Sequence, residues 1–290
     1  MSLSKILQSH DILSSIRGRT YDEIKGILLE KSSEYYEKNP EEGDTIKHNL
    51  ESFGLPSDAN TIKRVQENII FHYAEKILPL AGTPKQLADF VKNRIDLSQA
   101  KDQLEEAMRK GSVLAAVSHF GAVECTIPAL SYLNIPTNAV LKFSTQNFSD
   151  RIHDFANAME ESGMFAPIKF IEIGKPQLNS AFLMARVLDR KEVLFTVFDE
   201  ETPHSIPVRL FNKKVLGGAG LDRLLKIAHR NVTILNVFMI RTGDNIKMRL
   251  VPVDIKVENM AQVMFSNLQS VLEEHYEQWY FLHENIPFVD

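Results

Sequence analysis

The sequence predicts an α/β fold, a mixed sheet flanked by helices, preceded by a helical N-terminal region. From about residue 111 onward, short apolar runs rich in β-branched residues alternate with segments of helical periodicity, as expected for strands joined by helices. Before residue 110, apolar residues recur at spacings of three and four, as at Ile62, Val65 and Ile69, and glycine is rare. We therefore predict a helical region at 1–110 and an α/β domain at 111–290.

Loop breaks and capping residues divide the N-terminal region into separate helices. The breaks fall at 39–40, 55–58 and 82–84, where Pro, Gly, Ser and Asp gather. Thr83 is followed by Pro84 and, three residues after Thr83, by Gln86, which fits a capping box with proline in the first helical position. We expect a helix to begin there.

The predicted α/β domain consists of alternating strands and helices. The expected strands are 112–118, 139–143, 193–198, 208–211 and 232–240. The expected helices are 152–162, 178–188, 221–229 and 261–274. The glycines within 217–220 lack the spacing of a dinucleotide-binding loop, and we interpret them as the entry to the helix near Leu221.

Composition limits the classes of protein to be considered. The 290 residues include 33 Lys and Arg against 38 Asp and Glu, and this net charge of −5 argues against a general nucleic-acid binder. The single cysteine, Cys125, excludes an intramolecular disulfide, and we expect it to be a small core residue rather than a nucleophile. Residues 1–12 lack the apolar core of a signal peptide, and the stretch 232–240 is far shorter than the roughly 20 residues of a spanning helix. We expect a soluble, cytoplasmic protein without a transmembrane anchor.

The segment 117–124, Val-Ser-His-Phe-Gly-Ala-Val-Glu, is the strongest candidate for chemistry. An apolar strand ends at His119, Gly121 makes a turn, and Glu124 lies in the first turn of the next helix. In an open α/β sheet the ligand crevice lies at the carboxyl ends of the strands. A carboxylate folded back onto one ring nitrogen would make the other nitrogen a base for an attacking hydroxyl or amine. A histidine that merely caps the following helix is the competing interpretation.

Three stretches, in this order, share a pattern with one family. They are His-Phe-Gly-Ala-Val-Glu at 119–124, the apolar run ending in Asp-Glu at 193–200 with the apolar strand at 207–211, and Glu-Gln-Trp-Tyr-Phe-Leu-His at 277–283. Together they resemble the late (lauroyl/myristoyl) acyltransferases of lipid A biosynthesis, and the resemblance spans about 111–284. The last stretch is the most specific single match.

The resemblance implies an α/β sandwich of the glycerol-phosphate acyltransferase type. It also implies transfer of an acyl group from a thioester, commonly on an acyl carrier protein and otherwise on coenzyme A, to a hydroxyl or amine, without metal or cofactor. His119 would be the general base and Glu124 its orienting partner. Asp199 would support the site or only cap the next turn. Lys142 stands where the family often has an arginine; it would stabilise an oxyanion or hold an anionic substrate group, or be a solvated lysine.

Departures from the family pattern change the expected acceptor. Family members usually begin with a membrane anchor and carry two arginines after the last histidine, where this chain has Glu284 and Asn285. Tyr276 replaces the proline before Glu-Gln-Trp. We therefore expect a soluble relative that acylates a small or carrier-bound acceptor in a specialised biosynthetic pathway. The alternatives are acylation of a lipid A-type glycolipid, a thioesterase, and a non-catalytic module that binds a carrier protein or a lipid.

Two further clusters have both a functional and a simpler interpretation. Arg223, Lys226 and Arg230 fall at helical spacings and form a cationic stripe suited to an acidic carrier protein, although a solvated helix face gives the same pattern. The acidic residues at 199–201 with His204 have ligand types for a hard cation, but we interpret them as a solvated turn.

Overall fold

The computed structural model describes residues 2–142, 146–173, 180–202, 204–227, 231–254 and 259–289. Its centre is a seven-stranded sheet with the strand order β1-β9-β8-β2-β5-β3-β4. The strands are β1 (Ile95–Asp96), β2 (Ser112–Gly121), β3 (Thr137–Leu141), β4 (Ile168–Glu172), β5 (Val193–Val197), β8 (Val232–Thr242) and β9 (Asn245–Val253). Neighbouring strands from β8 to β4 are parallel, whereas β9 runs antiparallel to β8 and parallel to β1. The predicted α/β class with a mixed sheet is confirmed.

β2 is the central strand, and its sequence explains its place. Val113 lies opposite Val193 of β5 and Thr233 of β8, and residues 113–117 are all fully buried. A strand covered on both faces needs a continuous apolar run rather than an alternating one, and Val-Leu-Ala-Ala-Val supplies it. The C-terminal end of β2 therefore lies in the middle of the sheet, beside the carboxyl ends of its parallel neighbours.

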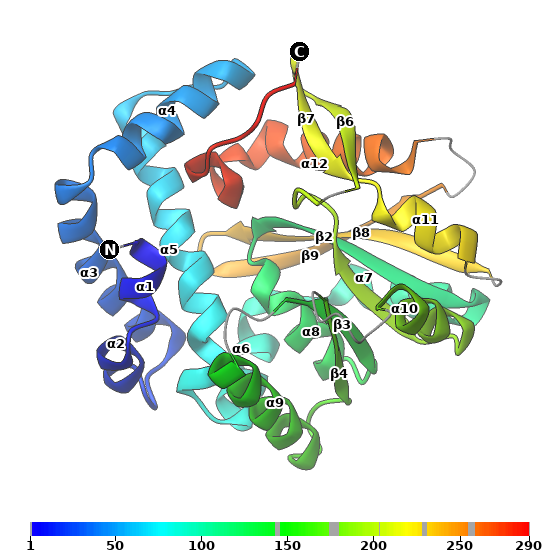
Figure 1. The fold of residues 1–290 in the computed structure, drawn as a ribbon. Helices are drawn as coiled ribbons and strands as arrows, with labels where there is room; N and C mark the ends of the chain where they lie inside the picture. The colour runs from blue at the N-terminus through cyan, green and yellow to red at the C-terminus, as the bar shows by residue number, and fades with distance from the viewer. Residues whose placement is uncertain are drawn as a thin grey trace.

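Helices cover both faces of the sheet. They are α7 (Ser98–Lys110), α8 (Thr126–Tyr132), α9 (Gln146–Glu161), α10 (Ser180–Asp189), α11 (Gly220–Ile227) and α12 (Met260–His275). A separate antiparallel hairpin consists of β6 (Ser205–Leu210) and β7 (Lys213–Gly218). Figure 1 shows α12 and this hairpin on one side of the sheet, and α7 and α8 on the other.

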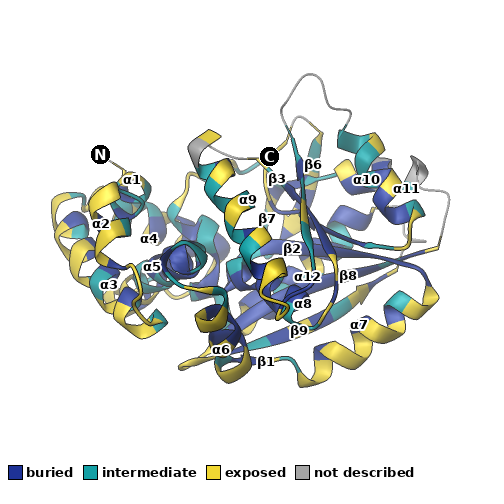
Figure 2. Ribbon diagram, turned by 90° about the horizontal axis from the view of Figure 1, so that it is seen from below, coloured by how far each residue is buried: buried dark blue, intermediate teal, exposed yellow. Residues whose placement is uncertain are grey.

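The N-terminal region is helical, as predicted. Its helices are α1 (Leu3–Leu7), α2 (His10–Ser15), α3 (Tyr21–Lys38), α4 (Glu41–Phe53), α5 (Ala59–Ala81) and α6 (Pro84–Arg94). The capping box at Thr83 and Gln86 is confirmed, with Pro84 at the start of α6. Helix α5 is the most buried of these helices, and the others lie around it with their exposed faces outward (Figure 2).

The N-terminal helices and the sheet share one hydrophobic core. The predicted boundary near residue 110 falls between the end of α7 and the start of β2. However, β1 belongs to the N-terminal part of the chain and pairs with β9 at the sheet edge. Buried apolar side chains continue without a break from α1 to the C-terminal segment. None of the helices within the described ranges is both long and apolar enough to cross a membrane.

The sequence did not predict the two-residue β1 or the strands β4, β7 and β9. The last three are only partly buried, and in β7 and β9 buried positions alternate with less buried ones. Uninterrupted apolar runs predict β2, β3, β5 and β8, and the short run at 208–211 predicts part of β6, whereas alternating strands give no such run. Gly217 and Gly218 lie in β7, and Gly220 begins α11 as expected.

Candidate active site

A sharp bend at the end of β2 places His119. The pairing of β2 with β8 becomes irregular after Val117, and Gly121 has a φ of +59°. A Cβ atom at Gly121 would lie 1.9 Å from the carbonyl oxygen of Met239, so only glycine fits there. The backbone N–H of Ala122 donates to the same oxygen at 2.8 Å. His119 is therefore held at the carboxyl end of the central strand, where α/β sheets bind ligands.

Asp199 fixes the orientation of the His119 ring. Its buried carboxylate accepts a hydrogen bond from the backbone N–H of His119 at 2.8 Å and lies 2.9 Å from the ring Nδ1. Trp279 donates its Nε1–H to the same carboxylate at 3.2 Å. Because an ionised carboxylate only accepts, Nδ1 carries the proton and Nε2 is left as the basic nitrogen.

Charges around the ring favour its protonated form. Burial alone disfavours a charged imidazole, but Asp199, reinforced by Glu200 and Glu124, outweighs it and raises the pKa of His119 above its ordinary value. Glu200 Oε1 lies 3.5 Å from Nε2, and the Glu200 side chain is half exposed. The ring is thus a base of increased strength.

The expected pairing of His119 with Glu124 is not what the structure shows. Glu124 lies in the short helix η1 (Val123–Cys125), and its Oε1 is 3.4 Å from Nε2 of His72 and 3.7 Å from Nζ of Lys76. The bend at Gly121 turns the chain toward α5, so the carboxylate five residues after His119 meets that helix instead of the imidazole. The orienting role belongs to Asp199, for which the sequence had left support of the site and turn capping equally open.

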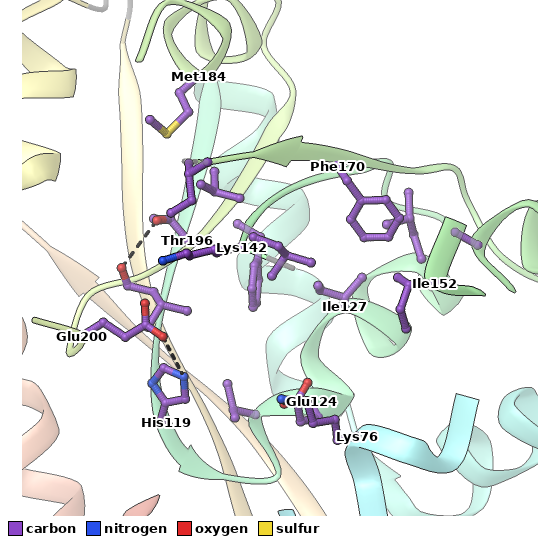
Figure 3. A pocket seen from close by; sticks show the side chains of 18 of the residues that line it. Lys76, His119, Glu124, Ile127, Lys142, Ile152, Phe170, Met184, Thr196 and Glu200 are labelled. Atoms are coloured by element: carbon purple, nitrogen blue, oxygen red, sulfur yellow. Dashed lines mark hydrogen bonds and ion pairs between the residues drawn. The ribbon is translucent and has the colours of Figure 1, made fainter. Parts of the chain in front are cut away.

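His119 and Glu124 nevertheless line one cavity of about 500 Å³. Its walls are mostly apolar and come from the sheet, α8, α9, α10 and α11, with side chains that include Ile127, Ile152, Phe155, Met159, Phe170, Phe195 and Leu224. Figure 3 shows His119 and Glu200 on one side of the cavity, Glu124 and Lys76 on another, and Phe170 and Ile152 farther away. The volume lies in the range of roughly 300–1,000 Å³ that small-molecule pockets have.

Lys142 lines the same cavity just after β3 and is exposed. Its side chain extends toward the side where Glu200 lies (Figure 3). Lys142 is therefore both solvated and part of the cavity wall.

The C-terminal segment contacts Asp199 and helps to position its carboxylate. The helix η2 (Tyr276–Gln278) places the Gln278 amide against the backbone of Arg241, accepting at 2.9 Å and donating at 2.9 Å. The next residue, Trp279, reaches Asp199 and forms a β-bridge with Phe120. In the sequence, the stretch 277–283 carries only a family resemblance. The contact of Trp279 with Asp199, and the contacts of His72 and Lys76 with Glu124, cannot be predicted from it because they join segments that are distant in sequence.

A buried ion pair supports the bend from the other side. Arg241 donates to both carboxylate oxygens of Glu75 at 2.8 and 2.7 Å, and to the carbonyl oxygen of Gly121 at 2.8 Å. Tyr21 donates to Glu75 at 2.9 Å. Arg241 therefore joins β8, the bend after His119 and helices α3 and α5.

The remaining sequence candidates have simpler outcomes. Cys125 is a buried free cysteine, as expected, and burial raises the pKa of its thiol. The cationic stripe lies outside what the structure describes, since Arg230 and the side chains of Arg223 and Lys226 fall on undescribed positions. In the described part of the chain no group of three His, Cys, Asp or Glu side chains is arranged to hold a metal ion.

A scan against models of known protein families gives no match to this chain, and a search of curated proteins gives none either. The function therefore has to be inferred from the geometry of His119 and its cavity.

Proposed function

We propose that the protein is an acyltransferase that moves an acyl group from a thioester, on an acyl carrier protein or coenzyme A, to a hydroxyl or amine. One observation carries this proposal. The Nδ1 of His119 is anchored to the buried carboxylate of Asp199, and its ring lines a mostly apolar cavity at the end of the central strand. A histidine with a fixed tautomer and a raised basicity is suited to remove a proton from a weak nucleophile.

The reaction needs only groups that the site contains. As the acceptor oxygen or nitrogen attacks the thioester carbonyl carbon, Nε2 of His119 takes its proton and Asp199 stabilises the imidazolium. The tetrahedral intermediate then collapses, the C–S bond breaks, and the thiolate leaves with the proton from the imidazolium. Lys142, which lines the cavity, would meet negative charge on the intermediate or on the substrate.

The shape of the cavity supports an acyl substrate. Aliphatic and aromatic side chains form most of its wall, and the polar groups gather on the side where His119 lies. An acyl chain buried there gains from the removal of apolar surface from water, at about 25 cal/mol per Å². The mixed sheet with helices on both faces is compatible with the sandwich of the glycerol-phosphate acyltransferase type that the resemblance to lipid A acyltransferases implies. A small or carrier-bound acceptor in a specialised pathway fits the departures from that family.

Thiol release tests the proposed reaction. Wild type and His119→Ala are incubated with acyl-carrier and acyl-coenzyme A donors of several chain lengths, with and without a crude acceptor extract. Loss of the general base should lower acceptor-dependent release by about 10²–10⁴-fold. His10→Ala is the matched control, because His10 is almost fully exposed on α2.

Each other outcome points elsewhere. Normal release by His119→Ala would remove the mechanism. Release by wild type without an acceptor would show a thioesterase, in which water takes the place of the acceptor. Absence of release from every donor, with measurable carrier or lipid binding, would show a binding module.

A further inference from the structure

Glu124 and Lys76 place a pair of opposite charges on the cavity wall across from Glu200. Their side chains are 32% and 33% exposed, and both line the cavity (Figure 3). Lys76 comes from α5, so the helical N-terminal region supplies part of the wall. The two groups are 3.7 Å apart, which is longer than an ordinary hydrogen bond of about 2.7–3.2 Å. Each therefore keeps hydrogen-bonding capacity toward the cavity.

His72 holds this pair from behind. It is 4% exposed, and burial, followed by the nearby charge of Lys76, lowers its pKa well below the ordinary value. The ring is thus neutral, and its Nε2 lies 3.4 Å from Glu124. Tyr280 packs against its face with the ring centres 4.5 Å apart. This built support explains why Glu124 points at α5 and stays beside the cavity instead of turning to solvent.

We propose that Glu124 and Lys76 form the acceptor subsite, and that the acceptor is a small molecule whose nucleophilic amine or hydroxyl lies a few bonds from an anionic oxygen group, a carboxylate or a phosphate. This subsite rests on the proposed acyl transfer, because that reaction is what makes the bound molecule an acceptor. Lys76 pairs with the anionic group, and Glu124 accepts a hydrogen bond from the amine or hydroxyl. The nucleophile then lies between Glu124 and His119, which line the same cavity.

Two features of the site favour this class of acceptor. An acceptor without an anionic group would leave the ammonium of Lys76 with Glu124 as its ion partner at 3.7 Å, whereas a carboxylate or phosphate in the cavity can approach the ammonium within hydrogen-bond distance. A large acceptor would compete with the acyl chain for the same space of about 500 Å³. A compact molecule with both a hydrogen-bond donor and an anion satisfies both charged groups.

Direct binding to the full-length chain tests the subsite without relying on turnover. Calorimetry measures the binding of two sets of amines. Glycine, β-alanine and L-serine carry a carboxylate, and O-phosphoethanolamine carries a phosphate in its place. Glycinamide, serinamide and ethanolamine lack the anionic group. At least one probe with a carboxylate or phosphate should bind about tenfold more tightly than its counterpart without that group, as a charge-assisted hydrogen bond provides. Lys76→Met should remove that difference and Lys76→Arg should retain it. Lys63→Met is the matched control, because Lys63 is exposed on the same helix.

The outcomes separate the subsite from the reaction. Preference for probes with a carboxylate or phosphate that depends on Lys76 supports the subsite even if no donor releases thiol, in which case only the acyl transfer fails. Equal binding of probes with and without the anionic group, or a preference that survives Lys76→Met, overturns the subsite while leaving His119-dependent thiol release intact.

Glu124→Gln tests the second half of the subsite by its kinetic signature. It should raise the KM for the acceptor about tenfold while kcat at saturating acceptor stays within about threefold. A kcat that collapses at unchanged KM would show that Glu124 acts on His119 or on the transition state, and would overturn its assignment to acceptor binding.

Discussion

The imidazole of His119 lies between two carboxylates that have different tasks. Asp199 is buried and holds Nδ1, so it sets the tautomer and cannot be displaced without breaking its contacts with Trp279 and the backbone. Glu200 is half exposed, lies near Nε2, and adds charge without fixing geometry. Asp199 fixes which ring nitrogen is basic, and Glu200 contributes to raising the pKa of the ring.

This division predicts two different pH responses. Because both carboxylates raise the pKa of His119, and because the base must be neutral, acyl transfer should fall as the pH decreases through that raised pKa. Glu200→Gln removes one negative charge, so the acidic limb should move to lower pH while the plateau rate is largely retained. Asp199→Asn should move the limb in the same direction and lower the plateau by about 10²–10⁴-fold, because the tautomer is no longer fixed.

NMR titration of the His119 ring checks the pKa directly, and the pH dependence of kcat/KM checks the rate. An acidic limb that stays in place in both variants, or that moves to higher pH, would contradict the assignment of these charges. Circular dichroism of Asp199→Asn shows whether the fold is retained.

At the scale of single residues the sequence predicts the candidate histidine, His119, but not the carboxylate that contacts it. His119 stands out because an apolar strand and a glycine surround it. Asp199 lies 80 positions later, and its contact with His119 requires that β2 and β5 be neighbours. A local pattern therefore favoured Glu124, which is close in sequence but is turned away by the bend at Gly121.

The element that decides the site is the irregular end of β2. The strand was expected to end near His119, but it continues to Gly121, where a left-handed backbone and a close approach to Met239 redirect the chain. Sequence reasoning finds such an element in part: the apolar run and the glycine are visible, while the pairing that makes glycine necessary is not. The half-buried strands β7 and β9 escaped prediction because their apolar residues alternate with polar or small ones and form no uninterrupted apolar run.

Gly121→Ala should disrupt the site more than an ordinary glycine replacement. The added Cβ combines left-handed strain with a collision against the Met239 carbonyl, so we expect a loss of about 2–5 kcal/mol in the free energy of unfolding. Gly163→Ala is the matched control, since Gly163 has a φ of +70° and open space around its Cβ position, and it should cost only about 1–2 kcal/mol. Urea unfolding measures both, and equal losses would show that the approach to Met239 does not constrain the bend.

On the scale of the whole molecule, the N-terminal helices help to form the cavity beside His119. The sequence predicts a helical region that precedes the α/β domain, and the structure shows that its helix α5 contributes Lys76 to the cavity wall and Glu75 to the ion pair with Arg241. Periodicity predicts that α5 has an apolar face. It does not reveal that this helix also carries the buried Glu75 and His72, because charged and polar residues within an amphipathic pattern are normally assigned to solvent.

The buried ion pair predicts that the two regions unfold together. Glu75→Gln leaves the guanidinium of Arg241 uncompensated in the interior, where both side chains are less than a tenth exposed, and should cost about 3–5 kcal/mol. Asp22→Asn is the control, because its pair with Arg94 is partly exposed and should contribute no more than about 1 kcal/mol.

The chain has one tryptophan, Trp279, whose fluorescence reports the C-terminal segment at the site, while far-UV circular dichroism reports mainly the helices. Unfolding curves from the two signals should coincide in the wild type and shift together in Glu75→Gln. If the helical signal were lost at lower urea than the tryptophan signal, the N-terminal helices would unfold independently, and the Arg241 pair would not couple them to the bend that holds His119.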